Sequence, residues 1–364
     1  MRSTTFKGCI RMLKLHLQVA LWLTVSIARV FADDQAGLCR VHDGHAKCLV
    51  IPADPNANNN IISDLAFSPD GKMLAVAYGR FRGLLQDPDP GQSIVWDVSN
   101  GKQLVTFNSY QDGVSSVDFS GDGKLLATGS YDGTVQIWRV SDWSRQVNIK
   151  VIQGPVRALH FSPDGSVLAV GVLQGNEESK QSLISLYRVT TGQKVTGLKG
   201  HTDSVMCVQY SPDGQLLVSA GMDRTVRLWD IEAGTNRILT QQDQMLILSV
   251  GFSHDGHLVA AGGGLFGIRK WQFQVWNTKT GKLKLQQNGS GEPLDSVIFS
   301  PDNHWLGTAS RGGKAKLLKL STKQTIDLSQ PGNKMAITPD GKLIALTEKN
   351  KITLSVFEKL IEKK

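Results

Sequence analysis

The sequence predicts an all-β fold made of seven repeated antiparallel sheets, and two features of the chain support this prediction. A turn sequence of the type Phe-Ser-Pro-Asp-Gly recurs at intervals of 38 to 52 residues. Each copy is followed by two apolar runs of strand length, and the second run usually ends in an aromatic residue. In such a turn proline presets φ, aspartate bonds its own backbone and glycine accepts a positive φ. The residues that lead into the seven turns are Phe67, Phe119, Phe161, Tyr210, Phe252, Phe299 and Ile337.

The most complete copy, residues 200–230, shows what one repeat builds. It begins with Gly-His, ends with Trp-Asp, and contains three apolar runs separated by the turn sequences Ser211–Gly214 and Met222–Thr225. This order predicts an antiparallel meander. One such sheet cannot cover both of its faces, so it needs neighbours. Self-similarity at roughly 40–45 residues is typical of the four-stranded blades of a β-propeller.

These repeats resemble those of the WD-repeat β-propeller family. The resemblance covers residues 46–357; residues 200–230 carry the full Gly-His and Trp-Asp pattern, and Trp96-Asp97 repeats half of it. It implies a seven-bladed propeller with four antiparallel strands per blade. It also implies that an N-terminal strand, residues 45–52 by alignment with residues 101–108, closes the ring as the outermost strand of the last blade. Closure would remove a free sheet edge at each terminus.

The resemblance also implies a role for four polar residues of the copy at residues 200–230. His201, Ser219, Asp223 and Trp229 match the positions that form a hydrogen-bonded chain inside a WD-repeat blade. In that chain Trp donates to Ser, Ser to His and His to Asp. A Ser-His-Asp set could otherwise suggest a hydrolase, but the resemblance favours a structural tetrad. In the second blade Tyr110 would stand where His stands.

Residues 1–32 do not belong to the repeats. A basic segment precedes the apolar run Val19–Ala28, and no acidic residue occurs before Asp33. This pattern is typical of a secretory signal peptide, with cleavage after Ala32 or Ala28, and the run is short for a membrane span. We therefore expect an exported protein, secreted or periplasmic; an uncleaved anchor and an organelle transit peptide are the alternatives. The rest divides into a hairpin segment (33–45), the propeller (46–357) and a charged tail (358–364).

The charge and the motifs argue against several kinds of ligand. Cleavage of residues 1–32 would lower the formal net charge from +8 to +3, because five Lys or Arg and no Asp or Glu would leave. So small a charge gives little reason to expect nucleic acid. Gly262–Gly267 matches G-x-G-x-x-G but no helix follows it, so we expect a flexible hairpin loop and no cofactor. We also expect no metal, a monomer, and no stable membrane insertion after signal cleavage.

A hairpin is predicted around Asp43-Gly44, a strong two-residue turn signal. In a secreted chain, Cys39 and Cys48 would then form a disulfide, because they face each other as a non-hydrogen-bonded pair with close side chains. A metal site is one alternative, although Cys39 and His42 would point to opposite faces of the strand; two free thiols are another. The expected register pairs are His42–His45, Val41–Ala46, Arg40–Lys47 and Cys39–Cys48.

The connections between the two middle strands are long in blades one, three and five, at residues 79–92, 171–181 and 262–272. Corresponding connections emerge on one face of the disc, and binding residues concentrate on loops held by a rigid scaffold. Because Arg and aromatic residues dominate interface hot spots, we expect blades one and five to carry the partner site. The alternative is that these rings fold back and cap their own blades. The expected site comprises Arg80, Phe81, Arg82, Phe266, Arg269, Lys270 and Trp271.

The function that these features favour is a non-enzymatic protein–protein interaction platform. No nucleophile, acid–base pair or metal cage is apparent, and the WD-repeat resemblance implies scaffolding. The alternative is a propeller enzyme or small-ligand sensor with its site at the central channel. Such a site would bring two or more carboxylates or histidines to the channel mouth. The basic residues of the expected site favour a partner with an acidic surface.

Overall fold

The computed structural model describes residues 41–42, 45–46, 49–51, 61–79, 90–173, 183–241, 245–265, 267–348 and 351–361. Two compact units divide the chain at residue 47. In the first unit, β1 (Val41–His42) and β2 (His45–Ala46) pair antiparallel with the predicted register. The signal segment, Cys39, Cys48 and the expected disulfide lie outside the described residues.

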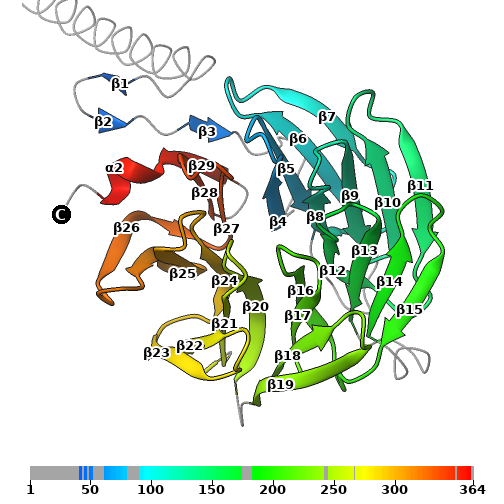
Figure 1. The fold of residues 1–364 in the computed structure, drawn as a ribbon. Coiled ribbons are helices and arrows are strands. Elements are labelled where there is room, and N and C mark those ends of the chain that lie inside the picture. The colour runs from blue at the N-terminus through cyan, green and yellow to red at the C-terminus, as the bar shows by residue number, and fades with distance from the viewer. Residues whose placement is uncertain are drawn as a thin grey trace, which may run out of the picture. The chain divides into compact units, whose positions relative to one another are not determined.

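The second unit is a seven-bladed propeller, as the sequence predicts. Seven antiparallel sheets follow one another around a ring, and the first strand of each lies nearest the centre (Figure 1). These inner strands contact each other in sequence, and the inner strand of blade seven contacts that of blade one. The ring is therefore closed.

The first four blades each have four strands, in order from the centre outwards. They are β4 (Ile62–Phe67), β5 (Met73–Tyr78), β6 (Gln92–Asp97) and β7 (Gln103–Phe107); β8 (Val114–Phe119), β9 (Leu125–Ser130), β10 (Thr134–Arg139) and β11 (Arg145–Lys150); β12 (Val156–Phe161), β13 (Val167–Val172), β14 (Ile184–Arg188) and β15 (Lys194–Leu198); and β16 (Val205–Tyr210), β17 (Leu216–Gly221), β18 (Thr225–Asp230) and β19 (Thr235–Gln241).

Blades five to seven complete the ring. Their strands are β20 (Leu246–Phe252), β21 (Leu258–Leu265), β22 (Lys270–Asn277) and β23 (Leu283–Ser290); β24 (Leu294–Phe299), β25 (Trp305–Lys319) and β26 (Thr325–Gly332); and β27 (Met335–Ile337), β28 (Leu343–Glu348), β29 (Lys351–Val356) and β3 (Leu49–Ile51). In blade six the long β25 supplies both middle positions, since its first half pairs with β24 and its second half with β26.

The closing strand is β3, which pairs with β29 at three positions, Leu49–Leu354, Val50–Thr353 and Ile51–Ile352. Closure by the N-terminal strand is thus confirmed, although the strand is shorter than the expected residues 45–52. The far end also differs from expectation. Part of the charged tail continues as the short helix α2 (Phe357–Ile361), because Leu360 and Ile361 pack against the apolar core of blades six and seven.

The recurrent turns have the same hydrogen bonds in every blade. In blade one the Ser68 hydroxyl donates to the Asp70 carboxylate (2.6 Å) and accepts the amide of Met73 (2.9 Å), while Gly71 has a φ of +70°. In blade six Asn303 takes the glycine position with a φ of +59°. The turn thus depends on serine and aspartate as much as on glycine, because their side chains bond the backbone that the strands leave unpaired.

Close contact between blades requires glycine in the second strands. A Cβ at Gly129 would lie 2.6 Å from Cγ1 of Val156, and one at Gly171 would lie 2.9 Å from Cγ1 of Val205. Both valines are fully buried. Blades two and three therefore each pack a valine of the next blade against their own backbone, and the apolar core there forms layers between successive blades.

Polar side chains on the inner strands connect neighbouring blades. An inner strand is the edge of its sheet, so half of its amide groups lack a ladder partner. The Ser116 hydroxyl accepts the amide of Leu159 (3.2 Å) and donates to Asp64 (2.7 Å), and Asp118 accepts the amide of Phe161 (2.7 Å). The wall of the central channel is thus held by hydrogen bonds that run around the ring.

Candidate binding site at the mouth of the central channel

The four tetrad residues form a continuous chain of hydrogen bonds inside blade four. Trp229 Nε1 donates to Ser219 Oγ at 2.8 Å, Ser219 Oγ lies 2.7 Å from His201 Nε2, and His201 Nδ1 lies 2.7 Å from Asp223 Oδ2. Since Ser219 already accepts from Trp229, its own proton goes to Nε2, so the Nδ1 proton goes to Asp223. Every polar atom is occupied and the indole is 1% exposed. The arrangement holds the blade together and leaves no free nucleophile.

Other blades keep only parts of this chain. In blade two Trp138 Nε1 donates to Thr128 Oγ1 (3.0 Å), and the Tyr110 hydroxyl lies 2.6 Å from the same oxygen, in the place of the histidine. In blade one the register places Val76 where Ser219 stands in blade four. The buried Trp96 Nε1 consequently finds no acceptor among the described residues.

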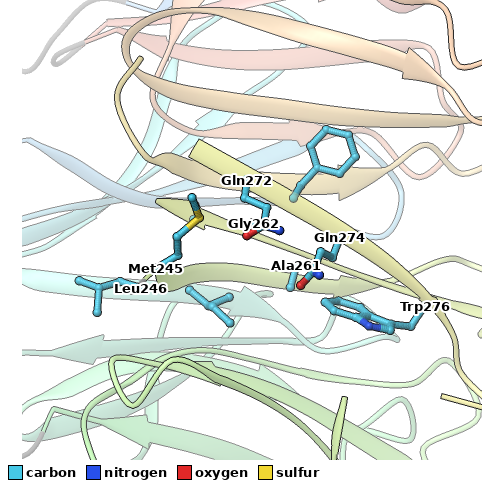
Figure 2. Close-up of a pocket in the computed structure, with 10 residues that line it drawn as sticks. Met245, Leu246, Ala261, Gly262, Gln272, Gln274 and Trp276 are labelled. Atoms are coloured by element: carbon cyan, nitrogen blue, oxygen red, sulfur yellow. The ribbon is translucent and has the colours of Figure 1, made fainter. Parts of the chain in front are cut away.

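Blade five has a cavity where blade four has its tetrad. Register places Ala261 at the position of Ser219 and Trp276 at that of Trp229. Both line a cavity of about 10 Å³, together with Gln274 and Met245 (Figure 2). Ala261 has a methyl group where Ser219 has its hydroxyl, so the acceptor for the tryptophan Nε1 is missing at this position. The space is about the size of one water molecule, so it has no room for a substrate.

The glycine-rich segment of blade five is a strand, which corrects the expectation of a flexible loop. β21 and β22 pair without interruption up to Leu265 and Lys270. A Cβ at Gly263 would lie 2.0 Å from the carbonyl oxygen of Leu246, and one at Gly264 would lie 2.4 Å from that of Lys270. The glycines therefore permit close backbone approach. They extend the hairpin of blade five, with Ile268 at its tip 57% exposed.

The structure describes three of the seven residues of the expected partner site. Arg80, Phe81, Arg82 and Phe266 lie outside the described residues. Arg269 and Lys270 are exposed at the hairpin tip, where Arg269 Nε lies 3.1 Å from Glu292 Oε1. Trp271 is half-buried.

Trp271 caps its own blade. Its indole lies against the backbone of β23, so that a Cβ at Gly289 would be 2.1 Å from Cζ2, and its Nε1 donates to the carbonyl of Ser290 at 3.1 Å. The ring also stacks parallel to Phe273, with centroids 6.3 Å apart and an interplanar angle of 3°. Because Gly289 has no side chain, the indole ring of Trp271 can lie flat on the backbone of the outer strand.

The Trp271→Ala variant is therefore expected to lose about 2 kcal/mol in free energy of unfolding, since a large half-buried ring is removed. Urea unfolding monitored by far-UV circular dichroism measures this loss. The neighbouring exposed Lys270→Ala variant is the control and should change by less than about 0.5 kcal/mol. Equal stability of the two variants would contradict the capping role.

The mouth of the central channel is a concave site to which every blade contributes. A cavity of about 370 Å³ lies there, lined by residues of all seven blades. Gly79, Tyr131, Leu173 and Met222 mark its rim, and each follows the second strand of its blade. The cavity therefore opens on the face where second strands pass to third strands, the same face as the hairpin tip of blade five.

A β-bulge in each of the first six inner strands aims side chains into this cavity. The register of each first and second strand shifts by one residue at the same place. A bulge leaves one residue unpaired and redirects its side chain. Five of the six bulged residues line the cavity: Ser63, Arg157, Met206, Leu248 and Asp295. Sequence reasoning missed this set, since bulge positions carry no shared residue type.

The charges at the mouth are predominantly positive. Arg311 Nε lies 3.3 Å from Asp295 Oδ2, and Lys334 Nζ donates to the Asp295 carbonyl at 3.1 Å. Arg157 has no hydrogen-bond or ion-pair partner within the part of the chain that the structure describes. Burial lowers the pKa of Lys334, Arg157 lowers it further, and Asp64 and Asp295 act in the opposite direction. The mouth thus holds three cations and one carboxylate among the described lining residues.

A second cavity of about 250 Å³ lies at the other end of the inner strands, beside the recurrent turns. Asp118 and His160 both line it. Burial raises the pKa of Asp118, while the positive charge of His160 and the amide of Phe161 oppose that effect. Both groups already bond the backbone, because Asp118 accepts the Phe161 amide and His160 Nδ1 lies 2.8 Å from the Phe161 carbonyl oxygen.

The described ranges contain no cluster of three or more His, Cys, Asp or Glu residues arranged to hold a metal ion. Across those same ranges, no helix has the length and apolar character needed to cross a membrane.

Comparison with known proteins identifies the repeats. The family model "WD domain, G-beta repeat" matches residues 101–139 and 192–230. Small ribosomal subunit protein RACK1y of Oryza sativa subsp. japonica is 30% identical over 292 residues, which cover 75% of this chain and 82% of that protein. Periodic tryptophan protein 2 of Arabidopsis thaliana is 31% identical over 228 residues, 63% of this chain but 23% of that protein.

A third relative matches a shorter part of the chain. MST50-interacting protein 11 of Pyricularia oryzae is 29% identical over 139 residues, 36% of this chain and 40% of that protein. The chain spans less than half the length of the first curated relatives it matches, whereas the match to RACK1y extends over most of both proteins. With its seven blades, its blade-four tetrad and this similarity, the chain belongs to the WD-repeat family of β-propeller proteins.

Proposed function

We propose that this protein is an exported, monomeric, non-enzymatic platform that binds a protein partner on the propeller face bearing the channel mouth. The observation that carries the proposal is the mouth cavity, to which all seven blades contribute and into which five bulged residues point. The floor of this site is rigid, because its five bulged residues are fixed by strands rather than by loops. Rigid concave surfaces bind partners with little ordering cost.

The relatives support a role in protein interaction. One carries a name that places it in the small ribosomal subunit, and another a name that records interaction with a second protein. Export rests on the N-terminal sequence, where a basic segment and a ten-residue apolar run precede the first acidic residue. Both arguments are independent of the cavity.

The partner surface is proposed to extend from the cavity to the hairpin tip of blade five. Ile268, Arg269 and Lys270 are exposed there. The connection that begins at the rim residue Gly79 contributes Arg80, Phe81 and Arg82 by sequence. Trp271 serves this surface indirectly by holding the hairpin against β23.

Chemical crosslinking and affinity capture of the mature protein from its own compartment tests this function. Charge reversal at the tip, Arg269→Glu with Lys270→Glu, is expected to reduce capture of the crosslinked partner at least about tenfold. The matched control is Lys282→Glu with Lys284→Glu, two exposed lysines at the start of the outer strand of the same blade, one just before β23 and one within it. A partner captured equally by both double variants would remove the tip from the surface, and the absence of any specific partner would count against a platform.

A small-ligand or catalytic role is the second candidate. The convergence of Asp118 and His160 in the cavity beside the turns favours it. The platform remains the stronger proposal, because both groups already bond the backbone of Phe161 in blade three.

A further inference from the structure

We infer that the mouth of the channel is a carboxylate-binding pocket, and that it receives an acidic side chain from the protein partner. This inference rests on the proposed function, because it assigns the chemistry of the group that the platform recognises. Three observations support it. Arg157 has no partner among the described residues, Lys334 lines the same cavity, and the Asp295 carboxylate is already paired with Arg311.

Arg157 is the residue best placed to bind an anion. It is the bulged residue of β12, so its side chain leaves the sheet and lines the cavity. Its guanidinium has no hydrogen-bond or ion-pair partner among the described residues. A guanidinium carries five N–H donors in a planar fork that matches the two oxygens of a carboxylate. Leaving such a group unpaired inside a cavity is costly unless a ligand completes it.

Lys334 makes the site more strongly cationic. It directly precedes β27, the inner strand of blade seven, and its Nζ donates to the carbonyl oxygen of Asp295 rather than to a carboxylate. Its side chain and that of Arg157 line the same cavity, and burial and Arg157 both lower the pKa of Lys334; like charges at such a site repel one another. An anion bound between them would relieve that repulsion. Asp64 does not fill this role, because its carboxylate accepts a hydrogen bond from Ser116 in the channel wall.

Asp295 does not neutralise this pair. Its carboxylate lies 3.3 Å from Arg311 Nε, so its charge is shared with a third cation. Among the described lining residues, three cations therefore face one carboxylate, an excess of two positive charges. The apolar part of the lining, Met206, Met222 and Leu248, could pack against the methylene groups of an inserted glutamate. A cavity of about 370 Å³ has room for one such side chain with its solvent.

An acidic segment of a protein fits better than a free carboxylate ion. The cavity lies on the same face as the exposed Arg269 and Lys270 of the blade-five hairpin. A segment that inserts one glutamate at the mouth could place further acidic residues toward that tip. A small dicarboxylate would reach only the mouth, and its affinity should be correspondingly lower.

The test uses the full mature chain and a fluorescein-labelled, N-acetylated hexaglutamate peptide, with hexaglutamine as the neutral control. Fluorescence anisotropy is expected to show binding of hexaglutamate alone, weakening as salt rises. Arg157→Gln should reduce its affinity about 30-fold or more. Arg139→Gln, which removes an exposed arginine paired with Asp142 in blade two, should leave it unchanged.

A second measurement avoids any dependence on variant folding. In the wild-type protein, modification of arginines by phenylglyoxal should be slowed at Arg157 by hexaglutamate, and unaffected at Arg139, as read by peptide mass spectrometry. Equal binding of hexaglutamate and hexaglutamine, unchanged affinity in Arg157→Gln, or no protection of Arg157 would each overturn the inference. Glutarate binding as tightly as the peptide would overturn the assignment to a protein segment. A partner captured from the compartment that Arg157→Gln still binds would also overturn it, but would leave the platform proposal standing.

Discussion

Replacing Trp229 with alanine is expected to lower the free energy of unfolding by about 3–5 kcal/mol. The indole is 1% exposed, and a Cβ at Gly200 would lie 2.9 Å from its Cη2, so the surrounding backbone is shaped to the ring. Truncation leaves a cavity and removes the donor to Ser219. The buried hydroxyl then lacks one bond, which adds to the loss. Urea unfolding at neutral pH measures the change.

Leu318→Ala in blade six is the matched control for this prediction. Leu318 is buried on β25, at the position that Trp229 holds in blade four, and no polar chain depends on it. Its truncation should cost less, about 2–5 kcal/mol, from lost packing alone. A loss at Leu318 equal to or larger than that at Trp229 would mean that the tetrad adds nothing beyond apolar packing.

Acidification is expected to remove about 2 kcal/mol of stability through Asp223 alone. Burial raises the pKa of Asp223, but hydrogen bonds from His201, Thr225 and the amide of Thr202 outweigh burial and lower the pKa from 3.8 to about 2. A carboxylate whose native pKa lies below its unfolded value stabilises the fold above the unfolded value. That contribution disappears as the pH falls through the native pKa, here between about pH 4 and pH 2.

Comparison with Asp223→Asn isolates this contribution, because the amide cannot titrate. In urea melts the wild type should be about 2 kcal/mol more stable than the variant at pH 7, and the gap should close as the pH approaches 2. A gap that is constant with pH would show that the carboxylate charge is not responsible. The wild type should lose additional stability in the same window, because six turn aspartates also have lowered pKa values: Asp70, Asp122, Asp164, Asp255, Asp302 and Asp340.

The fold was predictable from sequence because the residues that determine the strands and turns of each repeat lie within that repeat. The Ser-Pro-Asp-Gly turns, the apolar runs around them and the spacing of the repeats determine seven meanders, and the resemblance of residues 45–52 to an outer strand indicated the closure that β3 makes. Strand lengths were less predictable. The glycines at 262–264 look like a loop in sequence, yet they form a strand because Leu246, Lys270 and Pro293 come too close for any side chain.

The tetrad could be read from sequence, since the resemblance maps it residue by residue, but the mouth cavity could not. Ser63, Arg157 and Asp295 share no residue type, and they meet only because a bulge recurs at one register position in six blades. A one-residue offset in pairing leaves no mark in the hydrophobic pattern. Trp271 shows a different difficulty, because an aromatic residue near a turn fitted both a binding surface and a cap on its own blade. Whether its ring is exposed depended on a glycine eighteen residues away on the outer strand.

The pairing of β3 with β29 has a consequence for the order of events during synthesis. Leu49 and Leu354 are neighbours in space, yet about three hundred residues must emerge from the ribosome between them. The sheets of the first six blades are each made from one continuous stretch of chain and can form as that stretch appears. The sheet of the seventh blade cannot, because β3 is synthesised first and β29 last. Contacts this distant in sequence slow folding, and until they form the growing chain presents an unpaired edge at β29. A chain that has to cross a membrane before folding would gain time from that delay.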